Sequence, residues 1–334
     1  MKNNSVMKNK INVALVCGGY SKEKEISVMG AESIEKHIPS DRYRVFKIVV
    51  EPHRWYYLAP DGSTQDVDKN NFTLPGVVFD VAYINIHGTP GENGLLQGYF
   101  DMLHIPYTTC DACTSALTFN KAFCNATLGY HGIRVAKSVH LVKNEKYDAE
   151  KIGKELGLPC FVKPACDGSS FGVSKVMKAE DLHDAIEKTF ADAKEVLVER
   201  FVQGKEYSCG LMRLKGEVIV FPLAAIVPEN DFFDYEAKYL GKSKEIVPAP
   251  VSDKLRLQME EIARKAYRIL NCKGVVRCDF IVEESTQEPY FLEVNTTPGQ
   301  SPESIVPKQI RHMGWTLEDL YDNVLQEALR SIPA

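Results

Sequence analysis

Residues 274–299 read GVVRCDFIVEESTQEPYFLEVNTTPG, and this stretch decides how the rest of the chain is interpreted. Two apolar runs, residues 275–282 and 290–294, flank a polar segment rich in Glu, Ser and Thr. Runs of this length and composition around a polar turn predict two buried strands. We expect the two strands to pair as a hairpin.

Charged and amide side chains recur at alternate positions of both strands. Side chains alternate between the faces of a strand, so Arg277 and Asp279 share one face, and Glu293 and Asn295 share a face of the second strand. In a hairpin, two carboxylates and an amide oxygen would converge beside a guanidinium. Hard oxygen ligands suit Mg²⁺ bound together with substrate phosphates, and an Arg beside them would stabilise developing negative charge. The alternative is an edge hairpin whose charges face solvent, but the apolar runs favour burial, and buried carboxylates need partners.

Length and composition describe an ordinary globular chain. Its 334 residues exceed one core and predict two or three domains, and 44% are hydrophobic and 25% charged. A net charge of −5 gives no general attraction to nucleic acid or to an anionic membrane, so we expect neither as a partner. No apolar run is long enough to span a bilayer, and residues 13–17 are too few for a signal peptide. Nine cysteines without an export signal are typical of a reducing, cytoplasmic compartment.

The first third of the chain alternates between predicted strands and helices. Residues 11–17, 44–50 and 77–86 are predicted strands, and residues 21–37 are a predicted helix. This order is typical of an open, mostly parallel sheet with crossover connections. Residues 111–129 are predicted to form one helix that leads into a second region.

The second region has the pattern of a smaller α+β unit. Its predicted elements are strands at residues 134–142, 160–163, 173–177 and 196–201, with helices at residues 147–156 and 179–190. Residues 208–227 predict two more strands. Residues 228–250 break the regular pattern, and a loop of this length is usually functional or disordered. Residues 252–270 form an amphipathic helix with Ser252 at the N-cap, and residues 315–332 form a closing helix.

Two Gly-rich segments could hold an anion or an amine. After a predicted strand, Lys163 precedes a Gly/Ser-rich loop whose backbone N–H groups could approach phosphate oxygens; the alternative is a plain hairpin turn. Glu23 follows the first strand, at the sheet edge where ligands bind, and could accept a cationic amine. The alternative is that the Glu23 carboxylate binds no ligand and only stabilises the positive N-terminus of the following helix.

Two further segments allow a structural or a functional interpretation. His87 precedes three glycines and a proline and could titrate near neutral pH, although a histidine at a strand end is often only hydrogen-bonded. Glu199 and Glu206 flank a strand end whose backbone amides could hold a flat base; the alternative is an ordinary buried strand. A dinucleotide site is poorly supported, because the chain has no GxGxxG.

Five motifs, in this order and spacing, resemble those of the D-alanine–D-alanine ligases, which belong to the ATP-grasp superfamily. They are GGxSxExE, HGxxGExGxLQG, VKPxxxGSSxGVSKV, DYEAKY and RxDF followed by EVNTxPG. The resemblance covers about Ile11 to Leu325. It implies a three-domain ATP-grasp fold of the α/β and α+β classes. Residues 1–113 would form an N-terminal open parallel-sheet domain that binds the first D-alanine, residues 114–207 a central subdomain, and residues 208–334 a C-terminal subdomain with the metal site and a mobile loop at 228–250.

The resemblance also implies a reaction. Two D-alanine molecules would be joined at the cost of ATP, through an acyl phosphate, to supply a peptidoglycan precursor. Two Mg²⁺ or Mn²⁺ ions would bridge the phosphates. The enzyme would be a cytoplasmic homodimer.

Residue roles follow from the same resemblance. ATP would be held by Lys121, Lys163, Ser170, Glu199, Phe201, Val202, Glu206 and Lys238. The metal ligands would be Asp279, Glu293 and Asn295. The first D-alanine would bind Glu23 near His87, with Tyr239 and Ser169 in a hydrogen-bonded group. Arg277 and the backbone N–H of Gly299 would stabilise the tetrahedral oxyanion. Ser304 and Ile305 would hold the carboxylate of the second D-alanine.

The chain departs from the family pattern at three places. Asn93 stands where Asp is common, Asp167 where Glu is common, and residues 300–303 differ beside the pocket for the second substrate. The intact segment 234–239 favours D-alanine over D-lactate. The alternatives are a ligase for D-lactate or for another amino acid, an inactive ATP-binding regulatory module, and an NAD-dependent oxidoreductase.

Overall fold

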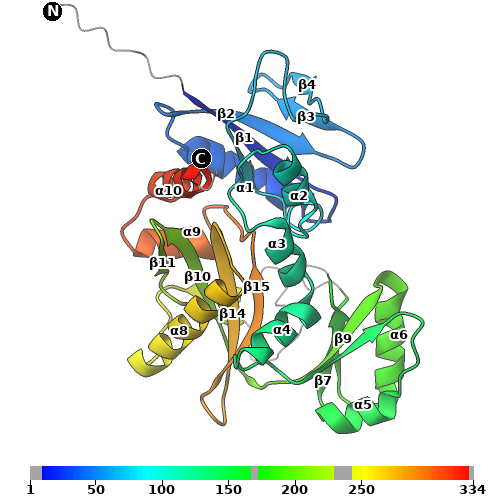
Figure 1. Ribbon diagram of the computed structural model, residues 1–334. Coiled ribbons are helices and arrows are strands. Elements are labelled where there is room, and N and C mark those ends of the chain that lie inside the picture. The colour runs from blue at the N-terminus through cyan, green and yellow to red at the C-terminus, as the bar shows by residue number, and fades with distance from the viewer. Residues whose placement is uncertain (1–9, 167–171, 229–242, 331–334) are drawn as a thin grey trace, which may run out of the picture.

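The computed structural model describes residues 10–166, 172–228 and 243–330. In this part of the chain the strands form three sheets of five, four and six strands. Figure 1 shows the N-terminal sheet at one end of the molecule, with the other two sheets side by side at the opposite end. None of the helices in the described ranges has the length and the apolar run that crossing a lipid bilayer requires.

The N-terminal sheet has the order β4-β3-β2-β1-β5. Its strands are β1 (Ile11–Gly18), β2 (Tyr43–Val50), β3 (Trp55–Leu58), β4 (Thr64–Asp66) and β5 (Val81–Ile84). The predicted parallel arrangement is confirmed, because β1 pairs in parallel with both β2 and β5. The antiparallel extension by β3 and β4 was not predicted.

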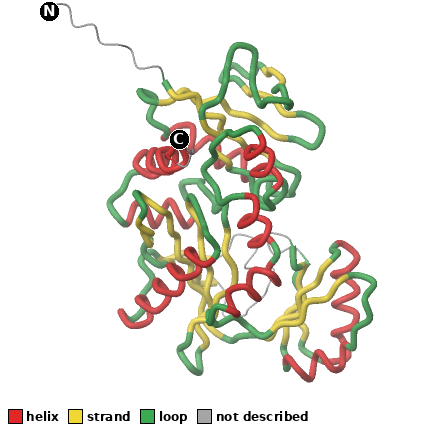
Figure 2. Tube along the Cα trace, viewed as in Figure 1, coloured by secondary structure: helices red, strands yellow, loops and turns green. Residues whose placement is uncertain are grey.

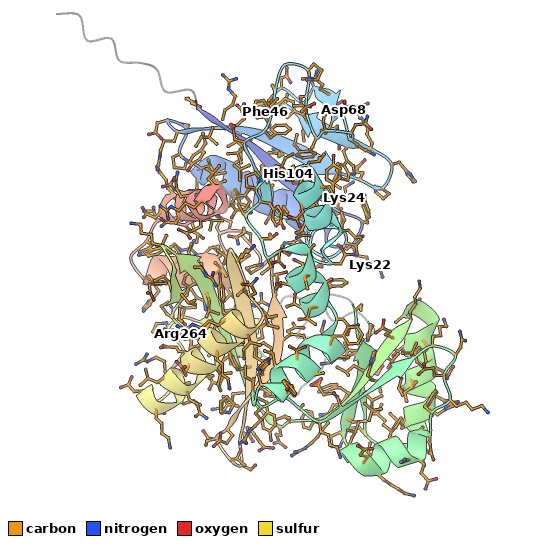
Figure 3. The ribbon with its side chains drawn as sticks, viewed as in Figure 1. Lys22, Lys24, Phe46, Asp68, His104 and Arg264 are labelled. Atoms are coloured by element: carbon orange, nitrogen blue, oxygen red, sulfur yellow. The ribbon has the colours of Figure 1, made fainter. Side chains whose placement is uncertain are left out.

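Helices and aromatic side chains cover the two faces of this sheet. On one face, α1 (Lys24–His37) packs with the C-terminal helix α10 (Leu317–Arg330), so the two ends of the chain share a core. On the other face, Phe46 contacts Tyr57 and Phe79 edge-on (Figure 3), in a core that also includes helix α2 (Leu95–Met102). Helix α2 was not predicted.

The central sheet is antiparallel and has the order β6-β9-β7-β8. Its strands are β6 (Ser138–Val142), β7 (Cys160–Pro164), β8 (Ser174–Val176) and β9 (Glu195–Arg200). Helices α5 (Ala149–Leu156) and α6 (Leu182–Asp192), with the short 3₁₀ turn Ala179–Asp181, cover its outer face (Figure 2). The other face is therefore left to the cleft described below.

The single helix predicted at residues 111–129 is wrong. The chain forms α3 (Ala112–Phe119) and α4 (Lys121–Tyr130), and the break falls at Asn120, whose backbone is extended. The Asn120 side chain accepts hydrogen bonds from the backbone N–H groups of Ala122 and Phe123. An asparagine that caps the backbone in this way competes with helix continuation and starts a new helix instead.

The C-terminal sheet has the order β13-β12-β10-β14-β15, with β11 beside β10. Its strands are β10 (Gly204–Leu214), β11 (Glu217–Val220), β12 (Ala224–Pro228), β13 (Ser243–Ile246), β14 (Val275–Glu283) and β15 (Pro289–Asn295). The prediction of two strands in residues 208–227 is therefore wrong by one strand. Helix α8 (Asp253–Ile269) begins after Ser252, whose side chain caps it as predicted, and α9 (Ile305–His312) follows the hairpin.

The predicted hairpin is confirmed. Strands β14 and β15 are antiparallel, with Asp279 opposite Glu293 and Arg277 opposite Asn295. The register shifts between Asp279 and Phe280, so the four polar residues all lie on one side of this irregularity. The hairpin thus presents its two carboxylates next to each other on the sheet.

Candidate active site

A cleft of about 500 Å³ opens where the three sheets meet. Many of the predicted site residues line it, namely Glu23, His87, Lys121, Lys163, Glu199, Phe201, Val202, Glu206, Arg277, Asp279, Glu293, Asn295, Gly299 and Ile305. Ser304 lies beside Gly299 and precedes α9. The predictions for Ser169, Ser170, Lys238 and Tyr239 fall outside the described residues.

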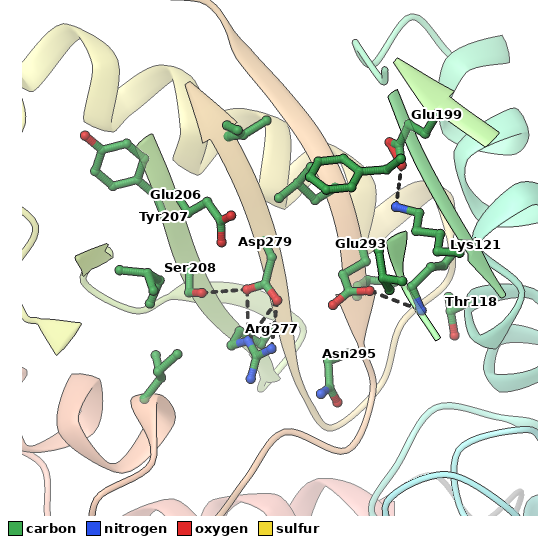
Figure 4. A pocket seen from close by; sticks show the side chains of 18 of the residues that line it. Thr118, Lys121, Glu199, Glu206, Tyr207, Ser208, Arg277, Asp279, Glu293 and Asn295 are labelled. Carbon is green, nitrogen blue, oxygen red and sulfur yellow. Dashed lines mark hydrogen bonds and ion pairs between the residues drawn. The ribbon is translucent and has the colours of Figure 1, made fainter. Parts of the chain in front are cut away.

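The centre of the cleft is a forked ion pair on β14 (Figure 4). The Nη2 of Arg277 donates to Oδ2 of Asp279 at 2.7 Å, and its Nε donates to Oδ1 at 2.9 Å. The hydroxyl of Ser208 donates to the same Oδ1 at 2.6 Å. Burial disfavours the charge on Arg277, but Asp279 outweighs burial and raises the pKa of the guanidinium. The Arg277 guanidinium therefore stays charged at neutral pH.

Oxygen donors gather on the facing strand. The Glu293 carboxylate lies 3.3 Å from Nζ of Lys121, which lowers the pKa of Glu293 to about 2 in spite of burial. Figure 4 shows the side chains of Asp279, Glu293 and Asn295 around the same space. Among the described residues no three His, Cys, Asp or Glu side chains form a metal-binding group. Two carboxylates and an amide oxygen fit a hard cation that takes its remaining ligands from water and phosphate.

The central sheet contributes a cation and a flat apolar wall. Lys163 on β7 forms an ion pair with Glu199 on β9, which is only 3% exposed. The rings of Phe161 and Phe201 pack edge-to-face, with centroids 5.6 Å apart. Nζ of Lys175 lies 4.0 Å from the centroid of Phe201. Aromatic side chains beside buried polar groups are suited to a flat heteroaromatic ligand.

The N-terminal domain closes the third side of the cleft. His87 is 6% exposed, and its backbone oxygen accepts from the Ser21 hydroxyl at 2.9 Å. That hydroxyl also accepts from the backbone N–H of Glu23, at 3.2 Å. Burial lowers the pKa of His87, and Arg277 lowers it further, while Glu23 opposes both. A neutral imidazole therefore faces the cleft at pH 7.

Two residues of the cleft were not predicted as site residues. Burial raises the pKa of Glu92 to about 7, although the backbone N–H of Gly88 donates to its carboxylate at 2.8 Å. Glu92 belongs to the HGxxGExG motif, which was the available signal. Ser208 lies opposite Asp279 on β10, and only the strand register places it there.

Comparison with known proteins agrees with the motifs. The family models described as "D-ala D-ala ligase N-terminus" and "D-ala D-ala ligase C-terminus" match residues 12–110 and 128–326. A D-alanine--D-alanine ligase of Phocaeicola vulgatus is 42% identical over 321 residues, 95% of this chain and 99% of that protein. The corresponding protein of Parabacteroides distasonis is 43% identical over 326 residues, 96% of this chain and 98% of that protein.

Solved structures of the same kind share the fold. The VanG D-Ala:D-Ser ligase from Enterococcus faecalis has a TM-score of 0.86 at 29% identity, covering 96% of this chain and 100% of that one. D-alanyl-alanine synthetase A from Vibrio cholerae has a TM-score of 0.87 at 26% identity, covering 97% and 100%. The enzyme from Bacillus anthracis complexed with ATP has a TM-score of 0.80 at 25% identity, covering 96% and 98%.

Proposed function

The chain belongs to the D-alanine–D-alanine ligase family, and on this premise we propose how its own residues carry out the family reaction. The enzyme joins two D-alanine molecules and converts ATP to ADP and phosphate. The carboxylate of the first D-alanine attacks the γ-phosphorus, and ADP leaves. The amine of the second attacks the resulting acyl phosphate, phosphate leaves, and D-alanyl-D-alanine remains as a precursor of peptidoglycan.

ATP binds between the central and C-terminal sheets. Its base lies against the Phe201 ring and Val202, with Glu199 and Glu206 receiving its amino group and ribose hydroxyls. Lys121, at the start of α4, and Lys163, on β7, contact the phosphates as point charges. Ser170 and Lys238 are further phosphate contacts by family resemblance.

Asp279, Glu293 and Asn295 would hold Mg²⁺ or Mn²⁺, two ions per site. Bound there, the ions would supply positive charge to neutralise the phosphates during phosphoryl transfer. The donor set supports this assignment, because the two carboxylates lie directly opposite each other on paired strands. Ser208 helps to fix the Asp279 carboxylate at the cleft through its 2.6 Å hydrogen bond to Oδ1.

The amino-acid substrates bind on the N-terminal side of the cleft. Glu23 receives the ammonium group of the first D-alanine, and neutral His87 lies beside it. Arg277 and the backbone N–H of Gly299 stabilise the oxyanion that forms when the second amine attacks. Ser304 and Ile305 hold the carboxylate of the second D-alanine at the N-terminus of α9, where backbone N–H groups attract anions. By family resemblance, Tyr239 and Ser169 would form a hydrogen-bonded group with Glu23.

The remaining proposals concern organisation. We assign residues 1–113 to the domain for the first D-alanine, 114–207 to the central subdomain, and 208–334 to the C-terminal subdomain, with the loop 228–250 closing over the site. We also propose a cytoplasmic homodimer, with no nucleic acid and no membrane as partners. The shared core of α1 and α10 supports a tight association of the first and third units.

One observation carries the proposed function: Arg277, Asp279, Glu293 and Asn295 face one cleft from two paired strands, together with cations from the central domain. The test is phosphate release from ATP with D-alanine, with L-alanine, and with no amino acid. We expect release only with D-alanine, and mass spectrometry should identify the dipeptide. Mixtures with D-serine and D-lactate test the second substrate.

A matched pair of variants ties the activity to this cleft. Asp279→Asn should abolish D-alanine-dependent phosphate release. Glu217→Gln changes an exposed carboxylate on β11 of the same sheet and should leave the rate unchanged. Phosphate release that does not depend on D-alanine, or an equal loss of rate in both variants, would overturn the proposal.

A further inference from the structure

The side chain of Asn120 uses all of its hydrogen-bonding groups at the start of α4. Its Oδ1 accepts from the backbone N–H of Ala122 at 3.0 Å and of Phe123 at 3.2 Å. Its Nδ2 donates to Oε2 of Glu195 at 2.8 Å. The residue is 4% exposed, so neither contact is easily replaced by water. An N-cap requires only the acceptor, and the bond to Glu195 is additional.

Glu195 connects this cap to three strands of the central sheet. It begins β9, and its Oε2 also lies 2.8 Å from Nε2 of His140 on β6. Its backbone oxygen accepts from the N–H of Ala165, directly after β7, at 3.0 Å. The oxygen of Ala165 in turn accepts from the N–H of Lys121 at 2.8 Å. Asn120, Glu195, Ala165 and Lys121 therefore form a closed ring of contacts.

Two cations of the cleft emerge from this ring. Lys121 is the first residue of α4, and its Nζ lies 3.3 Å from Oε2 of Glu293. Lys163 is two residues before Ala165 on β7 and points at Glu199. Lys121 lies on helix α4 and Lys163 on strand β7 of the central sheet. The backbones of these two elements are therefore joined through Asn120 and Glu195.

We propose that Asn120 and Glu195 are positioning residues that set the spacing between the ammonium groups of Lys121 and Lys163. This inference rests on the proposed function, in which both lysines contact the phosphates of ATP. A polyphosphate needs its cations at fixed separations, and a misplacement of about 1 Å lowers catalytic or binding efficiency strongly. Lysine side chains are flexible, so their spacing depends on how firmly their backbones are held.

Replacing Asn120 by Asp removes the Nδ2 donor that contacts Glu195 and keeps the oxygen acceptor that caps α4. Asp caps a helix as well as Asn does, but it cannot donate to Glu195. In Asn120→Asp the cap remains, and two carboxylates face each other where a hydrogen bond was. In the double variant Asn120→Asp with Glu195→Gln, one N–H of the glutamine amide donates to the new carboxylate and the other can donate to Nε2 of His140, which then acts as the acceptor. The contact between positions 120 and 195 thus returns with its polarity reversed.

The experiment measures KM for ATP, KM for D-alanine, kcat and Tm of the full-length protein. Asn120→Asp should raise KM for ATP about tenfold, the effect of one lost charge-assisted hydrogen bond, with kcat and KM for D-alanine changed less than about twofold. A loss confined to KM indicates ground-state binding. The double variant should return KM for ATP to within about twofold of the original value.

Three controls separate the possible explanations. Asp148→Asn exchanges the exposed N-cap of α5 and should leave KM for ATP unchanged. Lys121→Ala should raise KM for ATP more than Asn120→Asp does. Glu195→Ala removes the acceptor and keeps the cap; it should raise KM several-fold, and it serves as the test should Asn120→Asp not fold.

The results distinguish failure of the phosphate role of Lys121 from failure of the positioning role of Asn120 and Glu195. An unchanged KM for ATP in Lys121→Ala would refute the phosphate role of Lys121 and with it the positioning role. A raised KM in Lys121→Ala, with an unchanged KM in Asn120→Asp and Glu195→Ala, would refute the positioning role alone. A double variant that regains Tm but keeps the raised KM for ATP of Asn120→Asp would do the same, since the restored contact would then not restore the position of the lysines.

Discussion

Replacing Arg277 by Ala tests the chemistry at the centre of the cleft. The guanidinium has five N–H donors, and in the described structure Asp279 accepts from Nε and Nη2 only. Nη1 makes no hydrogen bond to a described residue, and it can donate to a ligand. If it stabilises the oxyanion, Arg277→Ala should lower kcat about 10²- to 10³-fold, or about 3–4 kcal/mol of transition-state stabilisation.

Nucleotide affinity should change much less. Asp279 keeps the 2.6 Å hydrogen bond from Ser208 in the variant, so its orientation toward the cleft survives. We expect the dissociation constant for ADP to change less than about threefold, because the charge that Arg277 meets develops only in the transition state. The lost ion pair joins side chains that are 20% and 15% exposed, and its loss should cost about 1–3 kcal/mol of folding stability.

The assay combines phosphate release at saturating ATP and D-alanine with a fluorescence titration of ADP, both well below Tm. Arg277→Lys is the control, because it keeps the charge and loses the fork, and it should recover only part of kcat. Equal losses in kcat and in ADP affinity would refute the reasoning, since Arg277 would then act on the bound nucleotide and not on the transition state.

Three further predictions follow from individual contacts. Burial raises the pKa of Glu92 to about 7, so the stability that this group contributes is complete below its ordinary pKa and is lost as the pH rises through 7. In denaturant unfolding, Glu92→Gln should therefore gain up to about 3 kcal/mol relative to the unchanged protein between pH 5 and pH 8, and a constant difference would contradict the burial of this charge. Glu293→Gln should weaken Mn²⁺ binding to the ADP-bound protein about tenfold or more in calorimetric titrations, whereas Glu217→Gln should have no effect. Gly274→Ala places a Cβ 1.9 Å from the backbone oxygen of Thr108, at a residue whose φ is +63°. Urea unfolding should therefore show that the free energy of unfolding falls by at least about 2 kcal/mol. A fall below about 0.5 kcal/mol, that of a neutral surface change, would contradict the geometry.

The hairpin could be predicted from sequence because its information is local. The alternation of polar and apolar residues in 275–282 and 290–294 fixes which side chains share a face, and the polar segment between them fixes the pairing partner. The N-cap of α8 was predictable for the same reason, since Ser252 directly precedes a long amphipathic pattern. In these two elements, the local conformational preference of each residue type matches the strand, turn or helix cap that it forms.

Other elements could not be predicted because the deciding interaction is distant in sequence. The helix pattern runs through Asn120, and the bond from the Asn120 side chain to Glu195, 75 residues later in the chain, has no local signal in the sequence. Helix α9 contains Pro307, which argues against a helix in sequence but is tolerated within the first turn. Within the site, Glu23 and the loop after Lys163 each had an ordinary structural interpretation, and Lys121 had no local signal. Only the resemblance of the whole set of motifs assigned these residues a role.

The arrangement of charge in the cleft favours the proposed ligand, a nucleotide bound together with a divalent cation. Lys121 faces Glu293, Lys163 faces Glu199, and Arg277 faces Asp279, so each of these three cations has a carboxylate as its neighbour. A polyphosphate alone would meet the carboxylates, and a metal ion alone would meet the lysines and the arginine. A metal-bound triphosphate carries both signs, so phosphate oxygens can approach the cations while the metal takes the carboxylates. This alternation also opposes binding of a plain dianion such as phosphate, which favours release of the product after the second step.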